Sequence, residues 1–177
     1  DNIGSVYFGQ GDYPKALEYI LKGNELDEEL GNKTGIASNL GNIGQIYAAM
    51  DNLPKALEYD SSALALYTEL GDKNGIARNL GNMGGIYAEQ GLYTKSLDHY
   101  TQALAISKEL GLQIGIATNL GAIGGTYLKV AKDKNPEALL TMFNGNKSSA
   151  LAQAQVYTDS AIVISKEIGD IHSLIKL

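Results

Sequence analysis

The sequence predicts an all-α fold built from repeated pairs of helices, and three observations lead to this prediction. Residues 31–70 align with residues 71–110, with identical residues at about half of the positions, and self-similarity at a fixed period is the signature of a repeat architecture. Apolar residues recur at helical spacing in two stretches of each unit. No stretch shows the strict polar and apolar alternation that indicates a strand.

The first helix of each unit, which we name helix A, carries one apolar face. Ile36, Leu40, Ile43 and Tyr47 follow one another at helical spacing, as expected for a helix that is buried along one side. The segment NLGNIGQIYAAM returns 40 residues later as NLGNMGGIYAEQ and again as NLGAIGGTYLKV. Helix A is therefore expected in every unit.

The second helix of each unit, helix B, has an apolar face of its own and clear boundaries. It begins near Pro54. A proline suits the first helical turn, because the backbone N–H that it lacks would have no partner within the helix there. Glycines that suit a left-handed residue just after a helix are Gly31, Gly71, Gly111 and Gly169. Asn32, Asp72 and Asp170 follow these glycines and can cap the next helix, whereas Leu112 cannot. Each period is therefore helix, turn, helix, turn.

These boundaries predict a single domain over residues 1–177 with about four helix pairs, in repeats at about 1–31, 32–71, 72–111 and 112–169. Residues 170–177 are expected to begin a further helix, and the incomplete first helix A indicates a piece of a longer chain. The fourth repeat is interrupted by an insert at 131–148, AKDKNPEALLTMFNGNKS, that predicts a short helix with an apolar face at 139–143. This face is expected to dock on the repeats or to meet another chain.

The positions of small and large residues resemble those of the tetratricopeptide repeat in its 40-residue form, similar to the repeats of kinesin light chains, Pins-type proteins and bacterial regulators. Leu40, Gly44, Tyr47, Ala56 and Ala63 carry the resemblance, and they recur as Leu80, Gly84, Tyr87, Ser96 and Ala103. It implies a right-handed superhelix in which the helices A line a concave groove. Asp51, which stands where Gly11 and Gly91 stand, departs from the pattern.

The resemblance also implies which residues face the groove. Glycines in the middle of a helix cost about 0.5 to 1 kcal/mol relative to alanine, so their recurrence here suggests a wall that leaves room for a ligand, unless it reflects relaxed packing. Asparagine amides at 2, 42 and 82 suit a peptide backbone, although a solvated helix face has the same composition. Arg78 could meet a carboxylate or be an ordinary surface charge. The expected groove residues are Asn2, Ser5, Ser38, Gly41, Asn42, Gln45, Arg78, Gly81, Asn82, Gly85, Thr118 and Gly121.

Two further sets of residues are expected to be structural. Gly44 and its equivalents Gly84 and Gly124 match the small residue that lets helices A and B approach closely. Asn39, Asn79 and Asn119 lie on the side of the apolar face, so we expect each to make a structural hydrogen bond to a neighbouring turn.

Composition argues against several classes of function. The net charge is −6 and the cations are scattered, which disfavours nucleic acid as a partner. With no cysteine and only two histidines, neither a metal site nor a catalytic nucleophile with its base is expected. We therefore predict no enzyme activity and no cofactor. No segment is apolar for long enough to predict a transmembrane helix, and the compartment is left open.

The function predicted is that of an interaction scaffold that binds a protein or peptide segment in the concave groove. Two alternatives stay open. The repeats could form the sensory region of a bacterial signalling protein whose output, a histidine kinase, a nucleotide cyclase or a transcription regulator, lies elsewhere in the chain. They could instead form a spacer or self-assembly unit, associating through exposed terminal repeats or through the apolar helix at 139–143.

Overall fold

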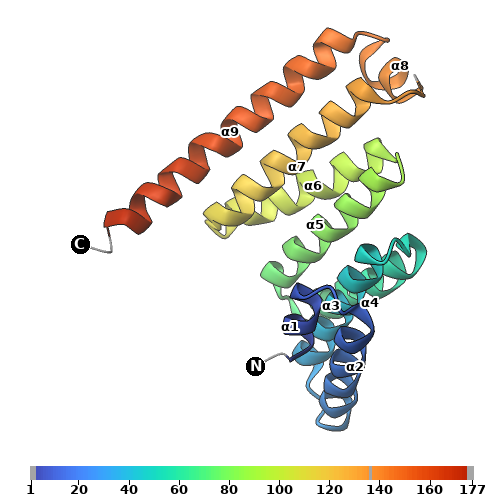
Figure 1. Cartoon of the computed structure of the whole chain (residues 1–177). Helices are drawn as coiled ribbons and strands as arrows, with labels where there is room; N and C mark the ends of the chain where they lie inside the picture. The colour runs from blue at the N-terminus through green and yellow to red at the C-terminus, as the bar shows by residue number, and fades with distance from the viewer. Residues whose placement is uncertain (1–2, 136, 175–177) are drawn as a thin grey trace. The chain divides into compact units, whose positions relative to one another are not determined.

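A computed structural model describes residues 3–135 and 137–174, and within these residues the chain forms nine helices and no strand. This confirms the predicted all-α class, as Figure 1 shows. The helices are α1 (Ile3–Gly9), α2 (Tyr13–Glu29), α3 (Lys33–Ala49), α4 (Leu53–Leu70), α5 (Lys73–Glu89), α6 (Tyr93–Glu109), α7 (Gln113–Lys132), α8 (Glu137–Phe143) and α9 (Lys147–Leu174).

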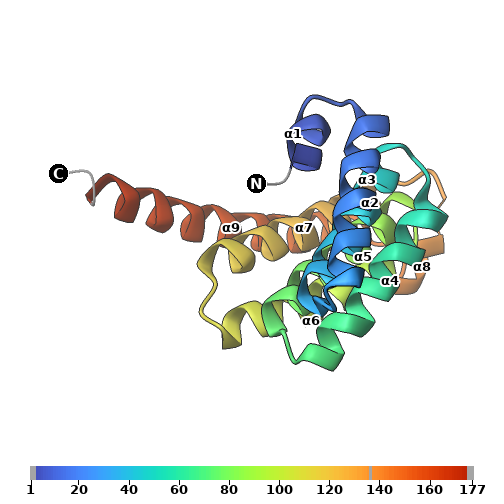
Figure 2. The same cartoon turned by 90° about the horizontal axis from the view of Figure 1, so that it is seen from below.

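The chain divides into two compact units, Asp1–Ile86 and Tyr87–Leu177, and each is described by itself. In unit 1, α2 lies between α1 and α3, and α4 packs beside α3. In unit 2, α7 packs between α6 and α9, and the short helix α8 lies across the ends of α7 and α9. Figure 2 shows α7 and α9 side by side from a second direction.

Glycine ends most of the helices as the sequence predicts. Gly31, Gly71 and Gly111 have φ angles of 65°, 66° and 68°, the left-handed region in which a side chain is disfavoured. The following caps are also confirmed, because Asn32 accepts a hydrogen bond from the Gly35 amide and Asp72 accepts one from the Gly75 amide. Leu112 makes no side-chain cap, as expected.

Two ends differ from the glycine pattern. Asp51 stands at a glycine position and takes the left-handed conformation all the same, with φ at 59°. The predicted helix end at Gly169, with Asp170 capping a further helix, is wrong: α9 continues as one helix from Lys147 to Leu174. A single glycine costs a helix only about 1 kcal/mol, so helical residues on both sides carry α9 through it.

The core of unit 1 consists of two apolar clusters between neighbouring helices. Ile20 of α2 packs with Ile43 and Ile46 of α3, and all three side chains are almost fully buried. A second cluster joins α3 and α4 through Ala37, Ala63 and Tyr67. Both clusters contain residues from the apolar faces predicted for helices A and B.

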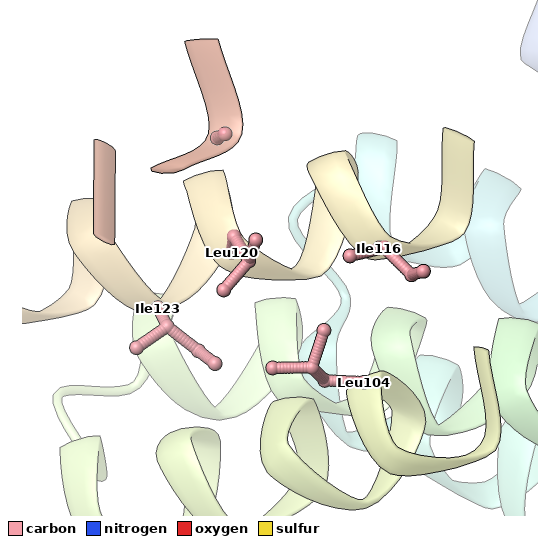
Figure 3. Close-up of a cluster of buried hydrophobic side chains, with 5 residues drawn as sticks. Leu104, Ile116, Leu120 and Ile123 are labelled. Carbon is pink, nitrogen blue, oxygen red and sulfur yellow. The ribbon is translucent and has the colours of Figure 1, made fainter. Parts of the chain in front are cut away.

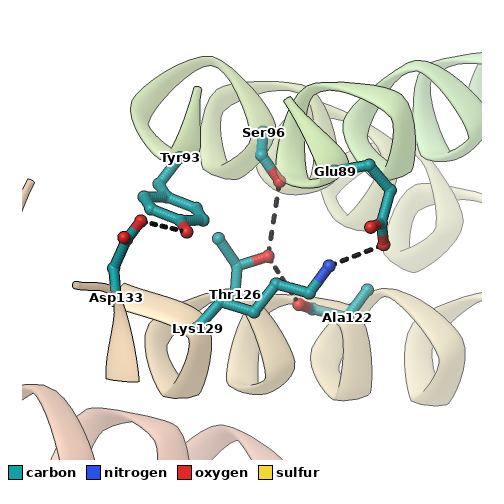
Figure 4. A network of polar contacts seen from close by, with 7 residues as sticks. All are labelled: Glu89, Tyr93, Ser96, Ala122, Thr126, Lys129 and Asp133. Atoms are coloured by element: carbon teal, nitrogen blue, oxygen red, sulfur yellow. Dashed lines mark hydrogen bonds and ion pairs between the residues drawn. The ribbon is translucent and has the colours of Figure 1, made fainter. Parts of the chain in front are cut away.

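The core of unit 2 lies along α7. Figure 3 shows Leu104 of α6 facing Ile116, Leu120 and Ile123 of α7. Ala161 of α9 belongs to the same cluster. Polar contacts extend this packing toward the end of α7, as Figure 4 shows. Lys129 pairs with Glu89, the buried hydroxyls of Ser96 and Thr126 lie 3.3 Å apart, and the Tyr93 hydroxyl donates to Asp133.

The predicted close approach of helices A and B at glycine is confirmed. A methyl group at Gly44 would lie 2.7 Å from an Asp60 carboxylate oxygen and 3.2 Å from the Ala56 carbonyl oxygen, both on α4. At Gly124 it would lie 2.6 Å from the Thr158 hydroxyl and 3.0 Å from the Ala154 carbonyl oxygen of α9. Since these contacts involve backbone, a larger residue would force the two helices apart.

The insert docks on unit 2. Helix α8 begins after Asn135, whose side chain accepts a hydrogen bond from the Glu137 amide, and it ends before Gly145, whose φ is 76°. Its last residue, Phe143, meets the ring of Tyr127 edge to face at 5.7 Å. In the second repeat the equivalent ring, Tyr47, is covered by Lys55 at 5.0 Å. An aromatic side chain from the insert therefore covers Tyr127 from outside the repeat.

Gly124 and Gly125 offer a direct test of the close-approach argument, because they are neighbours on α7 with opposite surroundings. A methyl group at Gly125 would have no atom within 4 Å. We expect Gly125→Ala to stabilise the chain by about 0.5 to 1 kcal/mol, and Gly124→Ala to destabilise it by about 1 to 3 kcal/mol. Urea unfolding of the two variants measures both. Equal effects at the two positions would contradict the argument.

Candidate functional site

The residues expected to face a groove fall into both units, and those of unit 1 lie on α1, α3 and α5. Asn42 and Gln45 of α3 are half-buried, with part of each side chain open to solvent. Ser5 of α1 and Arg78 of α5 are exposed, and Ser38 is half-buried. Gly81, Asn82 and Gly85 of α5 are half-buried as well. Asn2 lies outside the described residues.

Gly41 does not lie open on this surface, and the expectation that it does is wrong. The residue is buried. A methyl group there would meet the Asn79 side-chain nitrogen of α5 at 3.6 Å and Ala63 of α4 at 4.0 Å. The glycine therefore lies in the contact of α3 with these two helices, and it does not form the bare floor of a binding surface.

The structural role expected for Asn39, Asn79 and Asn119 is confirmed, since all three are buried and hydrogen-bonded. Each side-chain nitrogen donates to the preceding helix B or to its own helix. Asn39 donates to Asp27 at 2.8 Å, Asn79 donates to Asp60 at 3.1 Å, and Asn119 donates to the Gly115 carbonyl at 2.8 Å. The partners are side chains and helix carbonyls rather than the turns that the sequence suggested.

Arg78 is exposed but fixed in position by α4. Its guanidinium lies over the ring of Tyr67, 5.8 Å from the ring centre, and donates a hydrogen bond to the Tyr67 hydroxyl. A guanidinium over an aromatic face is attracted by the ring's electrons. Arg78 therefore presents its charge from a defined place on the surface of unit 1.

Asn82 is held by a buried carboxylate. Burial raises the pKa of Asp60 to about 7, and this rise is opposed by hydrogen bonds from the amides of Asn79 and Asn82. The carboxyl lies inside the fold, with no exposed surface. The Asn82 amide consequently serves the contact between α4 and α5. Asn42 has no such carboxylate in its own register, because the residue 40 positions before Asp60 is Ile20.

In unit 2 the corresponding surface belongs to α7. Thr118 is exposed, and Gly121 is half-buried because Ala161 of α9 lies 3.8 Å from where its methyl group would be. Gly125 is exposed with no neighbour. Of the glycines on α7, Gly125 is thus the one that leaves open space.

Sequence reasoning missed a pocket of about 380 Å³ that the insert forms with α6 and the end of α7. Tyr93 and Lys95 line it from α6, Asp133 from the end of α7, and Glu137 and Thr141 from α8. Burial and the hydrogen bond to Asp133 raise the pKa of Tyr93 to about 12, and the same bond lowers the pKa of Asp133. The unusual length of the insert was the one signal for such a feature.

Two features are absent from the described part of the chain. Over residues 3–135 and 137–169 there is no group of three or more acidic, histidine or cysteine side chains placed to hold a metal ion. None of the described helices combines the length and the apolar character that a membrane-spanning helix requires.

Helix pairs of this kind, with a small residue at each A/B contact and a 40-residue period, define a class of all-α repeat scaffolds. The sequence model of the tetratricopeptide repeat family matches residues 1–69 and 35–109. The chain belongs to the tetratricopeptide repeat family. A search of curated protein sequences finds no match.

Solved structures with low sequence identity share the fold. BtubC (BKLC) from P. vanneervenii has a TM-score of 0.73 at 17% identity, over 94% of this chain and 62% of that one. The apo form of RapI has a TM-score of 0.63 at 18% identity, over 95% and 67%. A putative kinesin light chain repeat protein from Podosopora anserina has a TM-score of 0.55 at 12% identity, over 98% and 89%. The chain thus spans about three fifths of the BtubC structure.

The docking of α8 makes a testable prediction. We expect Phe143→Ala to lower the free energy of unfolding by about 1 to 2 kcal/mol, because the half-buried ring loses its contact with Tyr127. Leu140→Ala is the matched control on the same helix, since the Leu140 side chain is 56% exposed, and it should change stability by less than about 0.5 kcal/mol. Thermal melts measure both; a loss at Leu140 alone would favour a different docking face.

Proposed function

We propose that this chain is a protein-interaction scaffold that binds a peptide segment on the helix A surface, and that Asn42 is a main contact. The family and the shared fold fit a repeat scaffold for protein interaction, and members of the family are typically not catalytic. The proposed role of Asn42 rests on one observation. Asn42 is half-buried on α3, and it is not one of the buried, hydrogen-bonded asparagines Asn39, Asn79 and Asn119.

The chemistry of this surface favours a peptide backbone. A side-chain amide offers a donor and an acceptor to a peptide group whatever side chain the peptide carries. Gln45, three residues along the same helix face, offers a second amide, because residues three apart on a helix lie on neighbouring positions. Arg78, fixed on Tyr67, offers one cation to a carboxylate of the ligand.

The experiment selects peptides from a random library on the immobilised wild-type chain and then measures the dissociation constant of the best peptide by fluorescence anisotropy. We expect Asn42→Ala to weaken binding about 3- to 10-fold, the effect of losing one or two modest hydrogen bonds. The melting temperature of this variant should match that of the wild type, since Asn42 is not one of the buried, hydrogen-bonded asparagines.

Asn74→Ala is the matched control, because Asn74 is an exposed asparagine in the first turn of α5, and its binding should be unchanged. Undiminished binding by Asn42→Ala would remove Asn42 from the site. Failure to select any peptide, together with sedimentation as a stable oligomer, would contradict the scaffold proposal and favour self-assembly.

A further inference from the structure

Helix α4 carries a buried carboxylate at a position where the neighbouring repeats have none. Asp60 has no exposed surface, and the residues at the same place in the adjacent repeats are Ile20 and Tyr100. Ile20 forms part of the apolar core of unit 1. An ionised carboxylate in such a place is strongly unfavourable unless a cation or several donors compensate it.

The compensation around Asp60 is incomplete for a charged group. The Asn79 side-chain nitrogen donates to Oδ1 of Asp60 at 3.1 Å, and Asn79 is itself only 1% exposed. Two buried acceptors of this pair, Oδ2 of Asp60 and Oδ1 of Asn79, find no donor within the described residues. A proton on Oδ2 of Asp60, donated to Oδ1 of Asn79, would satisfy both acceptors with one hydrogen bond.

Asn79 donates to Asp60 in a way that its equivalents do not, and the difference accompanies Tyr67, which lies two turns further along α4. Asn39 uses Asp27, and Asn119 lies 3.4 Å from the hydroxyl of Ser107. The equivalent residue on α4 is Tyr67, whose buried ring lies against Gly75 and whose hydroxyl accepts from Arg78. The Tyr67 hydroxyl is engaged by Arg78, and the Asn79 amide donates to Asp60 instead.

The charged groups on the helices around Asp60 contact other residues or are exposed to solvent. On α3, Lys33 pairs with Glu69 of α4, and the ring of Tyr47 stacks on Tyr59. On α4, Lys55 lies over Tyr47 and Glu58 is exposed. On α5, Arg78 lies over Tyr67 and Lys73 is exposed in the first turn. Burial and the amides of Asn79 and Asn82, not a neighbouring charge, therefore determine the protonation of Asp60.

We propose that Asp60 is held as a neutral carboxylic acid, paired head to head with the Asn79 amide, and that loss of its proton weakens the contact between α4 and α5. The proton comes from solvent and returns to it, so no other reactant is needed. The device makes the stability of unit 1 sensitive to pH, and it does not depend on the proposed peptide contact at Asn42.

The direction of the pH effect follows from the two states. Burial raises the pKa of Asp60 from 3.8 to about 7, so between these values the folded chain binds one proton more than the unfolded chain. The contribution of Asp60 to stability is therefore greatest below pH 4, falls as pH rises toward 7, and is lost above it. We expect the folding equilibrium constant to fall by up to about tenfold per pH unit between about pH 5 and 7.

The test compares urea unfolding at several pH values for the 177-residue chain and for Asp60→Asn, which keeps the shape of the side chain but has no proton to lose. The wild type should show the fall and Asp60→Asn should lack it. Asp27→Asn is the matched control, because Asp27 also accepts from an asparagine of the same register but is only half-buried. This variant should keep the pH slope of the wild type.

A second measurement covers the case in which Asp60→Asn does not fold. In protein labelled with ¹³C at the aspartate carboxyls, NMR should show one folded-state carboxyl that titrates near pH 7, and that resonance should be missing in Asp60→Ile, which copies Ile20. Equal pH slopes in the wild type and Asp60→Asn, or titration of every aspartate carboxyl below about pH 5, would overturn the proposal.

Discussion

The architecture of each unit depends on the close contact of helices at glycine. Gly44 and Gly124 let helix A meet the backbone of its own helix B, at residues such as Ala56 and Ala154. A second row, Gly35, Gly75 and Gly115, lets the first turn of helix A receive a side chain of the preceding helix B. Helix A is thus held from both sides through positions without side chains, and close packing of this kind transmits any change in residue volume.

This constraint accounts for most of the glycines on helix A, each of which costs helix stability in isolation. The interior glycines are placed where two helices need to approach, and the terminal ones where the chain turns with positive φ. Gly125, which has no neighbour within 4 Å, is one that close packing does not explain. The surface left for a partner therefore consists mainly of polar side chains.

Periodicity was enough to predict the helices, because a 40-residue repeat and a single apolar face per helix are local properties of the sequence. The end of α9 could not be predicted in this way. At Gly31, the Asn32 amide bonds back to the Asp27 carbonyl and the Asn32 side chain caps the next helix, so that contacts on both sides of the glycine favour the turn. Glycine permits such a turn, but the residues around it decide whether it forms.

The candidate site was harder to predict, because each of its residues depends on what lies across a helix contact. Asn42 and Asn82 are equivalent by sequence, yet only Asn82 has a carboxylate opposite it. That carboxylate, Asp60, serves Asn79 since Tyr67 replaces the acceptor that Asp27 and Ser107 supply in the neighbouring repeats. One aromatic residue on α4 therefore accompanies a change in the partner of Asn79 on α5, a non-local effect that no repeat pattern contains.

Repeats with the same backbone consequently differ in the chemistry of their contacts, and this difference decides which residues remain for a partner. Asn82 lies near the buried Asp60 carboxyl, and its amide lowers the pKa of that group while burial raises it. The Asn42 amide has the apolar Ile20 in the corresponding place, so a ligand can use it without disturbing the fold. A peptide bound at Asn42 would thus leave the pH-sensitive pair of Asp60 and Asn79 unchanged.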